Sequence, residues 1–267
     1  MGIIIHAEKD FEGMRSAGRL AATILDFITK HVKPGVSTGE LNDLCHKEIV
    51  GAGAVPAPLN YKGFPKSVCT SVNQVVCHGI PDYSKILKDG DIINIDVTVI
   101  LDGWHGDTSR MYWVGEPPEK AKKLCADTHK AMMLGIAQVK PGNTVGDIGH
   151  AIQSFAEGER GYSVVRDYCG HGLGKVFHTE PSIFHYGSAK MGIQLKPGMF
   201  FTVEPMINLG KSQTKLNPHD GWTVTTKDRS LSAQFEHSLG VTEEGPEIFT
   251  LSPKGYACPP YEIVIED

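Results

Sequence analysis

The chain has 267 residues, of which 40% are hydrophobic and 21% charged, a balance that is typical of one or two globular domains and excludes an intrinsically disordered protein. The net charge of −5 and the lack of a block of lysine and arginine residues argue against specific nucleic-acid binding. Because no uncharged apolar stretch is long enough for a signal-peptide core or a membrane span, we expect a cytoplasmic protein without membrane contact, and the six scattered cysteines predict free thiols.

Two helices are predicted in the first part of the chain. Apolar residues with a 3.6-residue rhythm predict an amphipathic helix within 10–32, ended by the turn at Pro34-Gly35. Ser37 and Glu40 have the spacing of a capping box, which predicts the start of a second helix. Gly51 lies where that helix is expected to end.

The same arrangement recurs later in the chain. A helix is predicted over about 116–139, and the sequence Val-Lys-Pro-Gly at 32–35 returns at 139–142, again followed by a helical pattern. We interpret this as an ancient duplication, with pseudo-repeats at about 10–112 and 117–250. The prediction is one α/β catalytic domain of residues 1–252, followed by a C-terminal tail of residues 253–267.

A β-hairpin is predicted between the first two helices and the later pair. Residues 91–101 alternate apolar and polar, which predicts a half-buried strand, and Asp102-Gly103 is a strong two-residue turn signal. With this turn, Thr98 lies opposite Asp107, and Asp96 shares a face with Asp107 on a cross-strand diagonal. Two carboxylates so placed can converge on cations, although a pair of solvated aspartates near a turn is the alternative at this point.

Acidic residues in the second half favour the metal hypothesis. Glu204 lies in an otherwise apolar strand, at the position that the repeat equates with Asp96, and Glu236 lies in another strand-like stretch. Two-fold symmetry would bring these three residues and Asp107 together, so that four acids hold two metals. His171, flanked by glycines, is the candidate imidazole ligand. Oxygen-rich ligation with one imidazole suits manganese, iron(II), cobalt or zinc.

Two further histidines occupy matching positions in the repeats. His78 stands in Val-Cys-His-Gly, and His178 stands in Phe-His-Thr-Glu-Pro. The symmetry that gathers the acids places these imidazoles on either side of the metals. We therefore expect both side chains to form hydrogen bonds with a substrate.

Five blocks of the sequence resemble the type I methionine aminopeptidases of bacterial kind, in the M24 metallopeptidase family. The blocks are NQVVCHGIP (73–81), INIDVTVILDGWHGDTSRM (93–111), CGHGLGKVFHTEP (169–181), FTVEPMI (201–207) and SAQFEHS (232–238). The resemblance implies the pita-bread fold, in which two α/β halves surround a curved antiparallel sheet with helices on its outer face. It also implies a two-metal site made by Asp96, Asp107, His171, Glu204 and Glu236.

The resemblance also implies the activity and the roles of single residues. A hydroxide activated by two metals would attack the first peptide bond and release the initiator methionine when the second residue is small. Glu204 would move a proton to the leaving amine, and His78 and His178 would contact the scissile amide and its carbonyl. The implied substrate-binding residues are Tyr61, Phe64, Cys69, His78, Phe177, His178 and Trp222.

Two residues near the implied pocket depart from the family pattern. Many relatives have tyrosine at Phe64, and cysteine where Pro58 aligns, so side-chain selectivity is expected to differ slightly. We expect the protein to bind two divalent ions, drawn from cobalt, manganese, iron(II) and zinc. We also expect an additional monovalent cation. The expected partners are the N-termini of nascent polypeptides. The protein is expected to be a monomer, and its tail to be either a flexible end or a transient ribosome contact.

The same residues leave two alternative functions to consider. An X-Pro aminopeptidase or prolidase shares the fold but usually has a substantial extra N-terminal domain, whereas here the first catalytic-domain helix begins by about residue 10. A non-enzymatic, RNA-binding protein of this fold would have lost metal ligands, and all five are present. Both features favour the methionine aminopeptidase interpretation.

Overall fold

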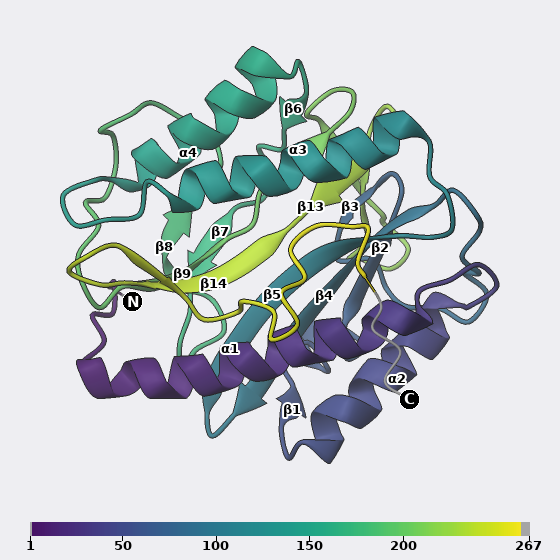
Figure 1. The fold of residues 1–267 in the computed structure, drawn as a ribbon, viewed down its shortest axis with the longest axis horizontal. Coiled ribbons are helices and arrows are strands. Elements are labelled where there is room, and N and C mark those ends of the chain that lie inside the picture. The colour runs from purple at the N-terminus through teal and green to yellow at the C-terminus, as the bar shows by residue number, and fades with distance from the viewer. Residues whose placement is uncertain (1, 263–267) are drawn as a thin grey trace.

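The computed structural model describes residues 2–262, and in this range a curved antiparallel sheet carries helices on one face (Figure 1). The helices are α1 (Glu8–Ile28), α2 (Thr38–Gly51), α3 (Glu119–Ile136) and α4 (Val145–Gln153), with short helical turns at Thr29–His31, Tyr61–Gly63 and Ser154–Glu159. The strands are β1 (Val55–Pro56), β2 (Cys69–Val72), β3 (Val75–Cys77), β4 (Ile92–Leu101), β5 (Trp104–Trp113), β6 (Ser163–Val164), β7 (Gly170–Gly172), β8 (Thr179–Ile183), β9 (Phe200–Val203), β10 (Met206–Asn208), β11 (Thr214–Leu216), β12 (Val224–Thr226), β13 (Ser232–Gln234), β14 (Glu236–Val241) and β15 (Pro246–Ile248).

The four predicted helices are confirmed. The second begins as its capping box predicts, because the Ser37 hydroxyl accepts a hydrogen bond from the Glu40 backbone N–H (3.1 Å) and the Glu40 carboxylate accepts one from the Ser37 N–H (2.8 Å). These two bonds satisfy backbone donors that the first turn of a helix leaves unpaired. In Figure 1, α1 and α2 cover the part of the sheet that holds β4 and β5, and α3 and α4 cover the part that holds β8 and β9.

The main sheet has nine strands and joins the two halves of the chain. Its central order is β1-β4-β5-β14-β9-β7-β8, with β2 added to β4 and β15 added to β14. Every pairing in it is antiparallel. The contact between β5 and β14 is the seam, because β5 belongs to the first half and β14 to the second. Any residues that both halves contribute to one site meet there.

The predicted hairpin register is confirmed to the residue. Asp96 pairs with Ser109 and Thr98 pairs with Asp107 across β4 and β5. The prediction of a half-buried strand is wrong, because both faces of β4 are covered over most of its length. Helix α1 lies on the apolar face, and on the polar face the Asn94 amide donates a hydrogen bond to the carbonyl of Gln234 in β13 (2.8 Å).

Two apolar clusters lie between the sheet and the helices. One packs Leu25 of α1 and Leu41 of α2 against Ile95 of β4, and the other packs Leu124 of α3 against Phe201 of β9. All five side chains are fully buried, and each contributes about 1.5–3 kcal/mol by leaving water. The clusters hold the helices on the face of the sheet that is away from the polar residues at the seam.

The C-terminal segment packs on the protein as far as the structure describes it. The Tyr261 hydroxyl donates a hydrogen bond to the carbonyl of Met111 in β5 (2.8 Å), and its ring lies edge-on to Tyr112 (5.4 Å). The tail therefore contacts the protein through Tyr261, while residues 263–267 of the predicted tail lie outside the described range. None of the helices within residues 2–262 has the length and apolar composition needed to cross a bilayer.

Candidate active site

Three carboxylates, two on strands and one directly after a strand, stand in one row across the seam. Asp96 of β4 pairs with Ser109 of β5, and Ser109 pairs in turn with Glu236 of β14. The register between β14 and β9 brings Glu204 beside Glu236. Glu204 is the first residue after β9 rather than a member of the strand, a small correction to the sequence prediction. Because paired residues of adjacent strands project from the same face, the row gathers three carboxyl groups.

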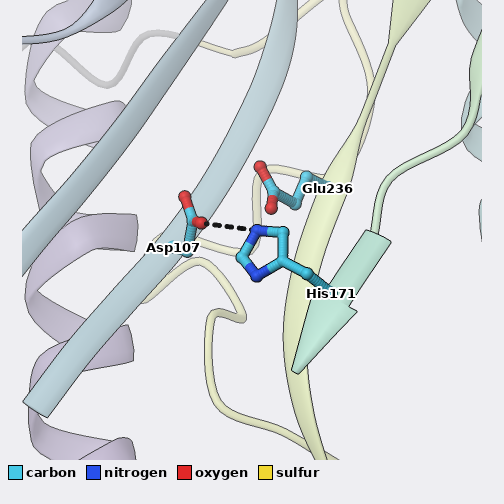
Figure 2. Close-up of side chains that lie close together, drawn as sticks. All are labelled: Asp107, His171 and Glu236. Atoms are coloured by element: carbon cyan, nitrogen blue, oxygen red, sulfur yellow. Dashed lines mark ion pairs between the residues drawn. The ribbon is translucent and has the colours of Figure 1, made fainter. Parts of the chain in front are cut away.

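Asp107 and His171 complete this cluster from neighbouring strands. Ligand atoms of Asp107, His171 and Glu236 all lie within 4.8 Å of one another, and Figure 2 shows their side chains turned toward a common centre. The His171 Nε2 atom is 3.6 Å from a carboxylate oxygen of Asp107 and 3.6 Å from one of Glu204. We call Asp96, Asp107, His171, Glu204 and Glu236 the acidic cluster.

Hydrogen bonds hold the side chains of the cluster in place. The Thr98 hydroxyl donates to Asp107 (2.6 Å). The Thr202 hydroxyl accepts from the backbone N–H of His171 (3.0 Å) and donates to the Glu204 carboxylate (2.7 Å). One threonine thereby fixes the spacing between two residues of the cluster.

Glu204 has two further partners that the sequence analysis missed. The Gln234 amide donates to its second carboxylate oxygen (3.2 Å), and the buried His185 accepts from its backbone N–H through Nε2 (3.1 Å). Gln234 and Thr202 each lie two residues from an acid of the cluster, so strand alternation is a signal that could have identified them. His185 carries no such signal, because its contact depends on the path of the loop after β8.

Burial and mutual repulsion make three carboxyl groups of the cluster harder to ionise. Burial, together with Asp107 and Glu204, raises the pKa of Asp96 well above its usual range. Burial and the same two neighbours, with Asp96, raise the pKa of Glu236. Burial also raises the pKa of Glu204 to about 7, although the charge of His171 and the Thr202 hydrogen bond act in the opposite direction.

The residues present fit divalent metal ions. One oxygen of Asp96, Oδ1, is buried and has no hydrogen-bond partner among the described residues. A buried, unpaired carboxylate oxygen beside other carboxylates is costly unless a cation compensates it. Oxygen donors with one imidazole suit hard or borderline divalent ions, and all six cysteines are free.

The acidic cluster forms the floor of a cavity of about 400 Å³. Every residue that the sequence analysis assigned to catalysis or binding lines this cavity, and Pro58 does so as well. Besides the acidic cluster, these residues are Tyr61, Phe64, Cys69, His78, Phe177, His178 and Trp222. The cavity is therefore acidic at its floor and mainly apolar along its wall, an arrangement typical of binding sites for small ligands.

The wall is built from packed rings. Phe64 meets Trp222 edge-on with centroids 5.3 Å apart, and Tyr61 contacts Phe177 (4.9 Å) and His178 (5.2 Å). We call these five residues the aromatic wall. Their segments are distant in sequence, so the wall forms only when the loops between the strands are in place.

The backbone at His78 is unusual. His78 has a φ of +56°, in the left-handed region that non-glycine residues rarely adopt, and its ring lies 6.1 Å from that of Trp222. The next residue, Gly79, passes so close to the carbonyl of Thr70 that a Cβ would lie 2.1 Å from it. Strained backbone of this kind is concentrated at functional sites.

An antiparallel sheet that presents buried carboxylates and an imidazole to one cavity is an arrangement that suits a metal-dependent hydrolase. The comparison with protein families identifies which one. Residues 12–243 match the model of metallopeptidase family M24, and the chain belongs to this family. The expected pita-bread fold and the resemblance noted from the sequence are both confirmed.

Two curated relatives are methionine aminopeptidases. That of Rickettsia prowazekii is 66% identical over 98% of this chain and 100% of its own length, and its crystal structure has a TM-score of 0.92. That of Escherichia coli is 57% identical over 94% of this chain and 95% of its own. The Xaa-Pro dipeptidase of Bacillus anthracis shares only the fold: it is 22% identical with a TM-score of 0.73, and this chain covers 62% of it.

Proposed function

We propose that this protein is a metal-dependent methionine aminopeptidase, which removes the initiator methionine of nascent proteins when the second residue is small. The observation that carries this function is that the acidic cluster and an apolar, aromatic wall line the same cavity. A buried cluster that binds metal supplies hydrolysis, and the wall supplies selectivity for an apolar side chain. The high identity to methionine aminopeptidases over the whole chain supports the same function.

The acidic cluster is proposed to hold two divalent ions, drawn from cobalt, manganese, iron(II) and zinc. Its ligands would be Asp96, Asp107, His171, Glu204 and Glu236. Divalent ions at such a site act as Lewis acids and lower the pKa of water, which is the chemistry that peptide hydrolysis requires. We also propose that the protein binds an additional monovalent cation.

The protein's own residues are proposed to bind the substrate and move the proton. Glu204 is held at both carboxylate oxygens and at its backbone N–H, so it presents one orientation for proton transfer to the leaving amine. His78 and His178 line the same cavity and would contact the scissile amide and its carbonyl oxygen. Asp96, with its unpaired oxygen, would also help to hold the substrate's free α-amino group, which explains action at the N-terminus.

The methionine side chain is proposed to lie against Tyr61, Phe64, Cys69, Phe177 and Trp222. Aromatic rings and a buried thiol form a polarisable surface, and a thioether makes favourable contacts with aromatic rings. Phe64 and Pro58 are expected to alter side-chain selectivity slightly. The requirement for a small second residue is an expectation from the family resemblance.

The remaining proposals concern the organisation and setting of the chain. We propose one catalytic domain of residues 1–252 built from two pseudo-repeats, supported by the helix pair that covers each end of the sheet. The protein is proposed to be a cytoplasmic monomer that meets nascent chains near the ribosome, with transient contact there. No specific nucleic acid is proposed as a ligand.

Peptide hydrolysis before and after metal removal tests the proposed function. We expect a metal-replete preparation to cleave Met-Ala-Ser but not X-Pro-Gly peptides, and full chelation to abolish cleavage because the carboxylates alone cannot activate water. Readdition of manganese or cobalt is expected to restore it, which controls for unfolding. Activity that survives full chelation, preference for the X-Pro peptide or an inert metal-replete enzyme would each contradict the proposal.

A further inference from the structure

We infer that Tyr61, besides lining the cavity, is a positioning residue for His178: its hydroxyl donates to His178 Nδ1 and so leaves the ring proton on Nε2, available to the substrate. This inference rests on the proposed function, because it assigns a role within the same site. The hydroxyl of Tyr61 is 2.9 Å from His178 Nδ1. No other hydrogen-bond partner of the His178 ring is found among the described residues, so Nε2 is not engaged by the protein.

The backbone around Tyr61 is fixed in an uncommon conformation. Asn60 and Lys62, on either side of it, have φ values of +66° and +48°, and Gly63 follows with +88°. The two non-glycine residues are in the left-handed region, which residues with a side chain rarely adopt. Hydrogen bonds close the loop on itself, including one from the N–H of Asn60 to the carbonyl of Phe64 (2.8 Å). This loop holds the Tyr61 hydroxyl at a set position in the cavity.

The imidazole of His178 also has ring neighbours. Its ring lies against Phe177 (4.1 Å between centroids) and nearly parallel to Tyr61, at 27°. Phe177 stacks in turn on His105 of β5 (5.3 Å, 19°), whose backbone N–H donates to the carbonyl of Gly174 in the same loop (2.9 Å). The rings of Tyr61 and His178 are thus both restrained by their neighbours. The contact between the Tyr61 hydroxyl and His178 Nδ1 is therefore fixed by the surrounding structure.

The direction of this hydrogen bond decides what His178 offers a substrate. A neutral imidazole has one N–H donor and one acceptor nitrogen, and the partner of one nitrogen sets the role of the other. If the Tyr61 hydroxyl donates, Nε2 carries the proton and can donate to a carbonyl oxygen that gains negative charge. If the hydroxyl accepts, Nε2 presents a lone pair, which repels that oxygen.

The substitution Tyr61→Phe removes the hydroxyl and keeps the ring. We expect kcat for Met-Ala-Ser to fall about 10- to 100-fold, with KM within about twofold because the apolar contact remains. Nitrogen-15 NMR of the zinc-loaded wild type is expected to show His178 protonated at Nε2, and the variant to show a mixture of tautomers. The His178 signal is assigned by its loss in His178→Gln.

Tyr162→Phe is the matched control. It removes a tyrosine hydrogen bond of similar length (3.0 Å to Asp127) outside the cavity, so kcat and the His178 signal are expected to stay at wild-type values. A wild-type His178 that carries its proton on Nδ1, or a Tyr61→Phe enzyme with kcat within twofold of wild type, would overturn the inference. The tautomer of His178 in the wild type, measured by NMR, tests the inference even if Tyr61→Phe fails to fold. A wild type that does not cleave methionyl peptides contradicts the proposed function instead.

Discussion

The floor and the wall of the cavity are built in different ways. The acidic cluster stands on the adjacent strands β4, β5, β14, β9 and β7, or directly after one of them, so that strand register determines its geometry. The aromatic wall stands on loops, and Asn60 and Lys62 in one of them adopt left-handed backbone conformations. In the proposed function, the sheet places the metal ligands, whereas the loops place His178 and the rings that contact the substrate's side chain.

The two regions also differ in energetics. Burial and the neighbouring carboxylates raise the pKa values of Asp96 and Glu236, so this region lowers the stability of the metal-free protein. The aromatic wall is mainly apolar, and its pairs of aromatic rings add about 0.5–1.5 kcal/mol each beyond their buried area. Substitutions in the floor should therefore remove activity without loss of stability, and substitutions of Phe64 or Trp222 in the wall should change selectivity.

The largest effect is expected for Glu204→Gln. The amide keeps the shape of the side chain but can neither accept the proton nor bind a cation with the same charge. We expect kcat for Met-Ala-Ser to fall by about 10²–10⁴ at saturating metal. The Tm of the metal-free variant should not fall, because a buried charge is removed from among like charges. Peptide hydrolysis and thermal unfolding measure the two effects.

Glu159→Gln is the control for this substitution. Glu159 is exposed and has no salt bridge among the described residues, so neither kcat nor Tm should change. Loss of activity in this variant would show that the assay reports a general effect of charge. A Glu204→Gln enzyme that retains most of its activity would show that the floor is not the centre of the chemical step.

A smaller effect is expected for Trp222→Ala in the aromatic wall. Removing the indole takes away the edge-on partner of Phe64 and opens the apolar surface. We expect kcat/KM for Met-Ala-Ser to fall about 10- to 100-fold relative to that for Ala-Ala-Ser, since apolar pockets discriminate by about 1–3 kcal/mol. Steady-state kinetics on the two peptides gives this ratio.

Trp222→Phe tests whether the aromatic surface at this position sets the preference for methionine. Phenylalanine retains an aromatic surface, so the preference for methionine should fall by less than in Trp222→Ala. If both variants keep the wild-type ratio of the two peptides, the wall does not set selectivity. If both lose activity on the two peptides equally, the wall supports the floor and does not choose the side chain.

The sequence predicted the floor better than its surroundings. Asp102-Gly103 is a strong local turn signal, so the pairing of Thr98 with Asp107 could be derived to the residue and is confirmed. The repeat equates Glu204 with Asp96, and an apolar, strand-like pattern surrounds Glu236. Both arguments use short-range patterns, namely a turn, an alternation and a repeated motif.

Long-range packing was not predictable in this way. His185 contacts Glu204 because of the path that a loop takes after β8, and nothing in the local pattern indicates this contact. The polar face of β4 was expected to be open, but β13 covers it through a hydrogen bond to Asn94 from a residue 140 positions away. The packing of Tyr261 on β5 was missed for the same reason, because a single chain carries no signal for such pairs.

The smallest expected effect is on stability. Its dependence on pH distinguishes a titrating residue of the acidic cluster from a residue of the aromatic wall, which does not titrate. Burial raises the pKa of Glu204 to about 7, above the value of 4.5 that applies when the chain is unfolded. The native metal-free protein therefore binds more protons at this group than the unfolded chain does between these pH values, and the group costs stability as pH rises through that window. Above about pH 7 the cost is complete, and below about pH 4.5 it disappears.

Glu204→Gln removes this cost, so the metal-free variant should unfold at a higher temperature than metal-free wild type above pH 7, by about 2–4 °C for each kcal/mol. The difference in Tm should shrink as pH falls toward 4.5. Comparing these two proteins at each pH cancels the groups that Glu204 does not influence, such as the buried His237. His171 does not cancel, because burial lowers its pKa and the charge of Glu204, which the substitution removes, raises it. Trp222→Phe should show no such pH dependence relative to wild type, since the wall residue does not titrate. A difference in Tm that is constant with pH would mean that packing, not charge, separates Glu204→Gln from wild type, and the electrostatic contrast between floor and wall would fail.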